Sequence, residues 1–197
     1  FVQAGAIPLV ALTAWQALVD TAELSEGQRV LIHAAAGGVG HVAVQIAKAR
    51  GAYVIATASA PKHEFVEGLG ADDVIDYRTV DFAEAVGDVD VVLDTIGGDY
   101  QLRSLRTLKP DGIMVSTVPV AAEGLREEAE RLGVRAELIL VEADHAGMQA
   151  IADLVGDGRL RARIAETFPL SDAARAHEAG ETNRTAGKLV LVVREED

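Results

Sequence analysis

Short apolar runs alternate with helical patterns along most of the chain. Six runs are rich in Val, Ile and Leu with little polar alternation, which is typical of strands covered on both faces of a parallel sheet. These predicted strands are 29–33, 53–57, 73–75, 89–93, 112–117 and 134–141. The predicted helices between and after them are 38–50, 61–69, 79–86, 100–108, 123–132 and 145–155. The alternation predicts an α/β fold, a Rossmann doubly wound sheet of six parallel strands.

The glycine-rich turn after the first predicted strand is the most informative motif. Ala35, Gly37 and Gly40 follow the strand in the pattern A-x-G-x-x-G, and an amphipathic helix continues from them. Small residues at these positions keep the turn tight, admit a pyrophosphate and let the helix pack against the strand. The N–H groups of the first helical turn then attract phosphates. The motif predicts a dinucleotide site, with a purely structural turn as the alternative.

The end of the second predicted strand indicates which dinucleotide is favoured. An NAD site places an acidic residue there for the ribose 2′-OH, whereas this chain has Ala58, followed by Ser59 and Lys62. Without a carboxylate there is no repulsion against a 2′-phosphate, and a hydroxyl and an ammonium group can bind one. The pattern favours NADPH. The alternative for Lys62 is an ordinary solvated lysine.

Several motifs together resemble one known family. They are AAAGGVG at 34–40, VIATAS at 54–59, LGADDVIDY at 69–77, VVLDTIGG at 91–98 and KPDGIMVS at 109–116, and the tail with GKLVLVV at 187–193 is similar too. The chain resembles the zinc-independent medium-chain dehydrogenase/reductases, in the quinone oxidoreductase (zeta-crystallin-like) branch. The resemblance implies an oxidoreductase that uses NADPH to reduce a small-molecule quinone or an α,β-unsaturated carbonyl.

The resemblance also implies which residues border the cofactor. They are Ala36, Gly37, Gly38 and Val39 at the pyrophosphate, Ser59, Lys62 and Tyr77 around the 2′-phosphate, and Asp94, Thr95, Ile96, Ser116 and Thr117 beside the ribose and nicotinamide. Two of these have structural alternatives, because Tyr77 could cap the sheet edge and Asp94 could only fix a turn. Lys188 is expected to be a solvated strand residue. No residue of the chain is an obvious general acid, so no catalytic residue is predicted.

The two ends of the chain lie outside the six-strand pattern. Residues 1–22 are predicted to be a helical lead-in, residues 23–162 the NADP-binding Rossmann domain, and residues 163–197 a return segment. In the family, such a return segment packs on a GroES-like domain, which is expected to be missing here; the start at Phe1 rather than Met fits that expectation. The chain alone is therefore expected to be inactive or poorly active.

The composition of the chain excludes several classes of partner and site. The chain has 18 Lys and Arg against 31 Asp and Glu, a formal net charge of −13, which argues against nucleic acid and anionic membrane surfaces as partners. It has no cysteine, and its five histidines show no metal-binding spacing, so no metal site is predicted. We expect His33 to be packed and the His41 side chain to be solvated, with an approach of the His41 ring to the phosphates as the alternative. No signal peptide or membrane-spanning run is recognisable, so a cytoplasmic location is expected.

Two functions remain open at this point. One is the cofactor-binding half of a quinone or enone oxidoreductase, and the other is a non-catalytic NADPH-binding or interaction module that lacks a substrate domain. The apolar strand at 134–141 lies at the end of the predicted sheet. A homodimer through that edge is expected, unless the tail covers it.

Overall fold

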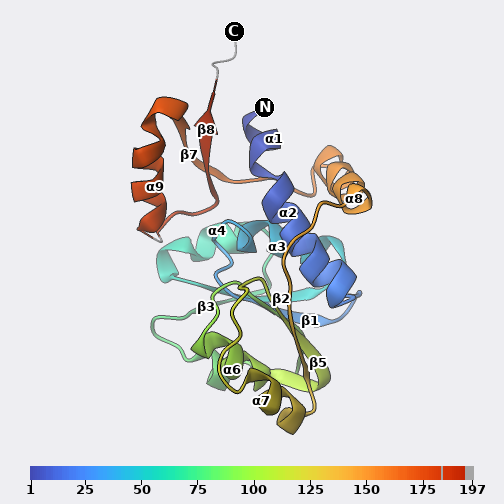
Figure 1. Ribbon diagram of the computed structural model, residues 1–197. Coiled ribbons are helices and arrows are strands. Elements are labelled where there is room, and N and C mark those ends of the chain that lie inside the picture. The colour runs from blue at the N-terminus through green and yellow to red at the C-terminus, as the bar shows by residue number, and fades with distance from the viewer. Residues whose placement is uncertain (183, 194–197) are drawn as a thin grey trace.

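The computed structural model describes residues 1–182 and 184–193. Its main feature is a parallel sheet whose six strands, in the described part of the chain, have the order β3-β2-β1-β4-β5-β6 (Figure 1). The strands are β1 (Arg29–Ile32), β2 (Tyr53–Ala58), β3 (Asp73–Asp76), β4 (Val89–Asp94), β5 (Leu108–Ser116) and β6 (Arg135–Leu138). This order is that of the doubly wound dinucleotide-binding sheet, so the predicted fold class is confirmed.

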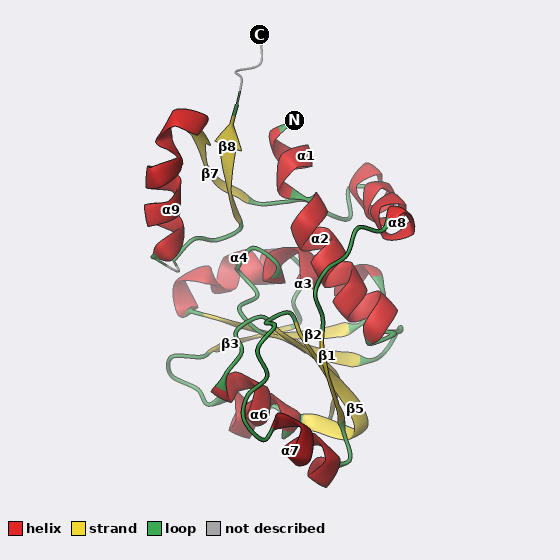
Figure 2. Cartoon of the chain, viewed as in Figure 1, coloured by secondary structure: helices red, strands yellow, loops and turns green. Residues whose placement is uncertain are grey.

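Helices cover both faces of this sheet (Figure 2). One face carries α3 (Gly40–Ala49) and α4 (His63–Gly68), and the other carries α5 (Phe82–Ala85), α6 (Asp99–Leu105) and α7 (Leu125–Leu132). Helix α8 (His145–Gly156) lies farther from the sheet, where it packs on residues Pro8–Trp15 of the lead-in. Val30 and Ile32 of β1 pack into the first core, and Leu31 packs into the second. Burial on both sides explains why the strands read as continuous apolar runs. None of the helices in the described ranges combines the length and apolar character that a membrane crossing needs.

The lead-in consists of three short helical pieces instead of one helix. They are α1 (Val2–Ala6), α2 (Pro8–Trp15) and a π-helical turn, η1 (Gln16–Thr21). Pro8 opens α2, where its missing N–H group costs no hydrogen bond. Ala11, Ala14 and Leu18 are fully buried in the same core as α3 and the sheet. The lead-in is therefore part of the main core.

The return segment folds as a separate β–α–β unit. It contains β7 (Ile164–Pro169), a short helix η3 (Leu170–Asp172), α9 (Ala173–Glu181) and β8 (Lys188–Val192), and its two strands pair in parallel. Figure 1 shows this unit beside α1 and above α4. The connection from α9 to β8 reaches the glycine turn, because the N–H of Gly187 donates to the carbonyl oxygen of Ala36 at 2.9 Å.

Two predicted elements near β5 and β6 have different bounds in the structure. Leu108 begins β5 rather than ending a helix, since α6 stops at Leu105. β6 covers only four residues, of which Arg135 and Glu137 are exposed, so the edge is shorter and more polar than predicted. Residues 139–141 leave the sheet, and Ile139 and Val141 pack on the core that includes the lead-in. The tail lies by α1 and the glycine turn, and the homodimer through β6 stays a prediction.

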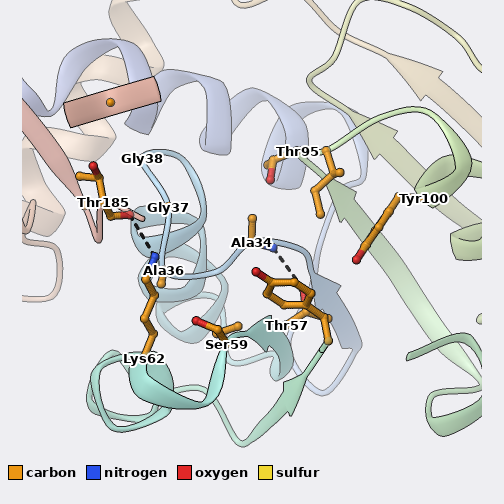
Figure 3. Close-up of a pocket in the computed structure, with 15 residues that line it drawn as sticks. Ala34, Ala36, Gly37, Gly38, Thr57, Ser59, Lys62, Thr95, Tyr100 and Thr185 are labelled. Atoms are coloured by element: carbon orange, nitrogen blue, oxygen red, sulfur yellow. Dashed lines mark hydrogen bonds between the residues drawn. The ribbon is translucent and has the colours of Figure 1, made fainter. Parts of the chain in front are cut away.

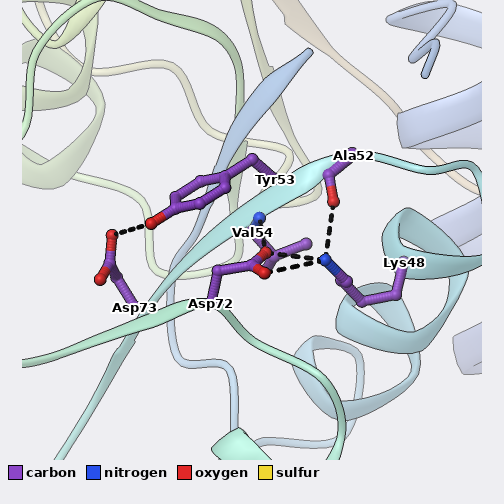
Figure 4. A network of polar contacts seen from close by, with 6 residues as sticks. All are labelled: Lys48, Ala52, Tyr53, Val54, Asp72 and Asp73. Carbon is purple, nitrogen blue, oxygen red and sulfur yellow. Dashed lines mark hydrogen bonds and ion pairs between the residues drawn. The ribbon is translucent and has the colours of Figure 1, made fainter. Parts of the chain in front are cut away.

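A polar network holds the amino ends of β2 and β3 together (Figure 4). The glycine turn lies at the opposite, carboxyl ends of the strands. The Lys48 Nζ lies 2.8 Å from an Asp72 carboxylate oxygen and also donates to the carbonyl of Ala52. The same carboxylate accepts the N–H of Val54 at 2.7 Å. Burial alone would raise the pKa of Asp72, but the bonds from Lys48 and Val54 lower it overall. The Tyr53 hydroxyl donates to Asp73 beside this network.

Candidate functional site

A pocket of about 580 Å³ opens at the carboxyl ends of the central strands (Figure 3). Its walls come from the glycine turn after β1, from the segment after β2 and from Thr95 and Ile96 after β4. β1 and β4 are neighbours at which the strand order reverses, and ligands of doubly wound sheets bind at such a point. A further wall comes from the return segment, through Thr185 and Gly187. The pocket is thus lined by the segments that follow β1, β2 and β4 and by the return segment, which is far from them in the sequence.

The glycine turn is held in shape by backbone bonds. The N–H of Gly37 donates to the carbonyl of Ala34 at 2.8 Å, and the N–H of Ala35 donates to the carbonyl of Thr57 at 3.0 Å. A Cβ on Gly40 would overlap the Ala34 carbonyl oxygen and lie 2.7 Å from the Ala35 Cα. Only glycine lets α3 begin this close to the end of β1, as the motif predicts.

His41 is completely buried at the first turn of α3, so the expectation of a solvated side chain is wrong. Its Nδ1 lies 2.8 Å from the carbonyl oxygen of Gly37, and its Nε2 lies 3.1 Å from the backbone nitrogen of Arg163. Because a backbone N–H only donates and a carbonyl only accepts, Nδ1 carries the proton and Nε2 accepts. Burial lowers the pKa of His41, which keeps the ring neutral.

The segment after β2 forms the wall at which a 2′-phosphate is predicted. Ser59 is 7% exposed, and Lys62 is half-buried with its Nζ donating to the carbonyl of Thr185 at 3.2 Å. Tyr77, just past the end of β3, stands at the pocket with 43% of its surface exposed. Among the described residues that line the pocket, none is Asp or Glu. The electrostatic environment on this wall therefore suits an anionic group.

Asp94 at the end of β4 is fully buried behind the pocket. Its carboxylate accepts the N–H of Ile96 at 2.9 Å, the N–H of Gly97 at 3.1 Å and the Ser116 hydroxyl at 2.7 Å. Gly97 has a φ of 81°, which favours glycine. Asp94 thus fixes the turn that presents Thr95 and Ile96, which was the structural alternative for this residue.

A second buried histidine stiffens the wall between these strands. His33 ends the β1 region, with Nδ1 at 3.2 Å from the Thr57 hydroxyl and Nε2 at 2.9 Å from the Ser104 hydroxyl. Its ring lies edge-on to Phe82 and Tyr100. Burial lowers the pKa of His33 to about 4, against an opposing contribution from Asp94. The expectation that His33 is packed is confirmed.

The structure brings most predicted cofactor residues to one pocket. Those that line it are Ala36, Gly37, Gly38, Ser59, Lys62, Tyr77, Thr95 and Ile96. Val39, Asp94, Ser116 and Thr117 lie outside its lining: Val39 packs on the core, and the others fix the turn after β4. Lining residues that sequence reasoning missed are Ala34, Thr57, Ala58, Tyr100, Gly180, Thr185 and Gly187.

The missed residues differ in how far a sequence signal could have found them. Ala34, Thr57 and Ala58 lie inside the motifs at 34–40 and 54–59, so assigning every residue of these motifs to the site would have included them. Thr185 and Gly187 lie in the return segment, where no local pattern marks a pocket. Lys188 was expected to be solvated, but it is half-buried, with its Nζ 3.6 Å from where a Gly38 Cβ would stand.

The fold and the pocket agree with a match to a known family. The family model described as zinc-binding dehydrogenase matches residues 69–191, and the chain belongs to this family. The chain is similar to the quinone oxidoreductase from Coxiella burnetii, with 42% identity, a TM-score of 0.91, and coverage of 96% of this chain and 60% of that one. These matches confirm the predicted resemblance to medium-chain dehydrogenase/reductases of the quinone oxidoreductase branch.

Two further relatives add to the comparison. The Escherichia coli quinone oxidoreductase complexed with NADPH has 33% identity and a TM-score of 0.89, over 96% of this chain and 64% of that one. The 2-haloacrylate reductase of a Burkholderia species is 38% identical over 93% of this chain and 61% of its own length. The chain thus spans about three fifths of these relatives, and only 3% and 9% of two polyketide synthase proteins that it also matches.

The family description names zinc, and the donor set of the described residues does not fit such a site. Within 1–182 and 184–193 no cluster of three or more His, Asp or Glu side chains could hold a metal ion. The whole sequence lacks cysteine, the thiolate ligand common at zinc. The groups that the pocket lining offers to a ligand are backbone amides, hydroxyl groups and the Lys62 ammonium group.

Proposed function

We propose that this chain binds NADPH in the pocket at the carboxyl ends of β1, β2 and β4. The observation that carries the proposal is the wall after β2, where Ala58 replaces the acid of an NAD site and Ser59 and Lys62 follow. A carboxylate there would select the free 2′-hydroxyl, whereas an ammonium group and a hydroxyl favour a 2′-phosphate. The NADPH complex of the similar Escherichia coli quinone oxidoreductase supports this choice.

Three parts of the chain would hold the cofactor. The amides of the glycine turn and the N-terminal end of α3 would bind the pyrophosphate, with the Lys188 ammonium group beside Gly38. Lys62 and Ser59 would bind the 2′-phosphate. Thr95 and Ile96, held by the buried Asp94, would border the nicotinamide half. Bound NADPH would supply the hydride, and the chain would position the cofactor.

We further propose that a protein of the relatives' length reduces a quinone or an α,β-unsaturated carbonyl. The names of the relatives support this class, because a quinone and a 2-haloacrylate each contain a C=C bond conjugated with a carbonyl or carboxyl group. Hydride would go to the electrophilic carbon of that bond. The matching proton would come from solvent or from a residue outside this chain, since no pocket residue is placed as a general acid.

Cofactor titration tests the first proposal directly. NADPH and NADH are titrated into the 197-residue chain, and binding is followed by the fluorescence of the reduced nicotinamide. We expect NADPH to bind about tenfold or more tightly, which corresponds to the roughly 1.5–3 kcal/mol of one charge-assisted hydrogen bond. Equal affinities for the two cofactors would overturn the assignment of the wall after β2.

Turnover tests the second proposal separately. The oxidation of NADPH is measured with a simple quinone and with a cyclic enone as acceptors. We expect binding but little turnover from these 197 residues, and robust turnover from a longer protein of the relatives' length that contains them. Rapid turnover by these residues alone would contradict the expectation that the substrate site needs more chain, and no turnover by the longer protein with either acceptor would contradict the substrate class.

A further inference from the structure

His41 is a buried titratable group that the proposed function does not use. Its ring stands between two segments that are 122 positions apart in the sequence, the glycine turn and the start of the return segment. The Nδ1–H donates to Gly37, and Nε2 accepts from the backbone of Arg163. One neutral imidazole therefore satisfies a carbonyl of the cofactor turn and an amide of the return segment together.

Two backbone hydrogen bonds add to this bridge, one within the return segment and one from it to the glycine turn. The N–H of Lys188 donates to the carbonyl of Arg163 at 2.8 Å, and the N–H of Gly187 donates to the carbonyl of Ala36 at 2.9 Å. Arg163 thus contacts the turn through His41 and the start of β8 through its carbonyl. A displacement of the return segment would break bonds at Ala36 and at His41, on both sides of Gly37.

We propose that His41 is a positioning residue that couples the docking of the return segment to the binding of NADPH at the glycine turn. The inference rests on the proposed cofactor site. The turn must hold its amides toward the pyrophosphate, and the return segment supplies Thr185 and Gly187 to the lining of the pocket and Lys188 beside Gly38. Binding at the turn and order in the return segment then stabilise each other, and the coupling is reciprocal.

The bridge requires a neutral ring, because a protonated Nε2 cannot accept the Arg163 N–H. The charged group that acts on the ring is Lys188 on β8. Arg163 meets the ring through its backbone N–H, with its guanidinium over the Phe65 ring, and the backbone of Gly37 and Gly38 supplies the other partners of the ring. Burial, with a further contribution from Lys188, lowers the pKa of His41. The bridge is therefore intact at neutral pH and is lost at acidic pH.

Two substitutions separate the two bonds of the ring. The side-chain amide of Asn places an N–H near the Nδ1 position, so His41→Asn keeps the bond to Gly37 and loses the acceptor for Arg163. The oxygen of Gln reaches the Nε2 position, so His41→Gln keeps the acceptor. His145→Asn, at an exposed position at the start of α8, is the matched control.

Hydrogen exchange and NADPH titration are measured on the full chain for all four proteins, with folding checked by circular dichroism. We expect His41→Asn to speed exchange at the Gly187 and Lys188 amides and to weaken NADPH about tenfold, the equivalent of one lost hydrogen bond. His41→Gln should change both much less, and His145→Asn neither. As the pH falls, the two proteins that keep His41, the wild type and His145→Asn, should lose NADPH affinity, and the two His41 variants should lose less.

The outcomes distinguish this inference from the cofactor assignment. If the wild type binds no NADPH, the proposed site fails, but faster exchange at Gly187 in His41→Asn without cofactor still supports the bridge. If His41→Asn leaves the exchange of Gly187 and Lys188 unchanged, or if it changes exchange while NADPH affinity stays at the wild-type value, the coupling is overturned.

Discussion

The Nζ of Lys62 donates a hydrogen bond to the backbone carbonyl oxygen of Thr185 at 3.2 Å, across 123 positions of the chain. The cation on the predicted 2′-phosphate wall is thus already directed into the pocket by a residue of the return segment. A phosphate oxygen is a stronger partner for an ammonium group than a neutral carbonyl. The lysine is therefore held close to its proposed ligand and can exchange one acceptor for the other.

The first prediction concerns this lysine. Lys62→Ala should weaken NADPH about tenfold or more and leave NADH within about twofold, since only the 2′-phosphate needs the charge. Lys48→Ala, which removes a lysine paired with Asp72 at the far edge of the sheet, is the control and should change neither affinity. Fluorescence titration measures both cofactors. An equal loss for NADH would show that Lys62 does not bind the phosphate.

The second prediction concerns the close approach of α3 to β1. In Gly40→Ala the new methyl group meets backbone atoms of Ala34 and Ala35, which cannot rotate away. We expect a loss of at least about 2 kcal/mol in the free energy of unfolding, the usual cost of overpacking. Gly68→Ala in α4 is the control, because a Cβ there has no neighbour within 4 Å, and it should be neutral or slightly stabilising. Urea unfolding compares the two, and equal effects would contradict the prediction.

The third prediction is a pH dependence set by His33. Its pKa is about 4 when folded and about 6.5 when unfolded, so the unfolded chain binds the extra proton between these values. The stability that neutral His33 supports is present above pH 6.5 and falls as the pH drops toward 4. Between pH 7 and pH 5 the loss amounts to about 2 kcal/mol.

Urea unfolding at these two pH values measures the slope. His41 contributes in the same direction, so the test compares the wild type with His33→Gln, in which only the His33 share is removed. The variant should be less stable at pH 7 and should show a smaller drop between the two pH values. The same drop in both proteins would assign the pH dependence elsewhere.

The fourth prediction concerns the turn after β4. The Asp94 carboxylate accepts hydrogen bonds from Ile96, Gly97 and Ser116. In Asp94→Asn an NH₂ group replaces one carboxylate oxygen, so at least one of these donors loses its acceptor. A buried mispaired donor costs about 1–3 kcal/mol of stability. Because the turn carries Thr95 and Ile96, the affinity for NADPH should fall as well. Thermal unfolding and cofactor titration of one preparation check both effects, and unchanged stability would show that the carboxylate does not fix this turn.

The sequence predicted the sheet and the turn because their signals are local. Val30, Leu31 and Ile32 read as a strand buried on both faces, and Gly40 is required by atoms only five and six positions away. The wall after β2 was predicted for the same reason, since Ser59 and Lys62 follow a recognisable strand. Near-neighbour constraints of this kind leave a pattern in a single sequence.

The parts that could not be predicted depend on contacts between distant segments. His41 and Lys188 were expected to be solvated, and both are covered where the return segment meets the turn. β6 reads as a long apolar strand, but Ile139 and Val141 are apolar because they pack against the core that includes the lead-in. The apolar character of a residue predicts that it is buried. Which residues it packs against depends on the tertiary fold.

The bond between Gly187 and Ala36 joins residues 151 positions apart (187 − 36). At a synthesis rate of about 5–20 residues per second, roughly 8–30 s separate the emergence of these two residues from the ribosome. The glycine turn can fold early, whereas Thr185, Gly187 and Lys188 reach it only when the return segment has been made. In a nascent chain the pocket therefore lacks this wall for that interval, and its lining residues come together only after the return segment has been synthesised.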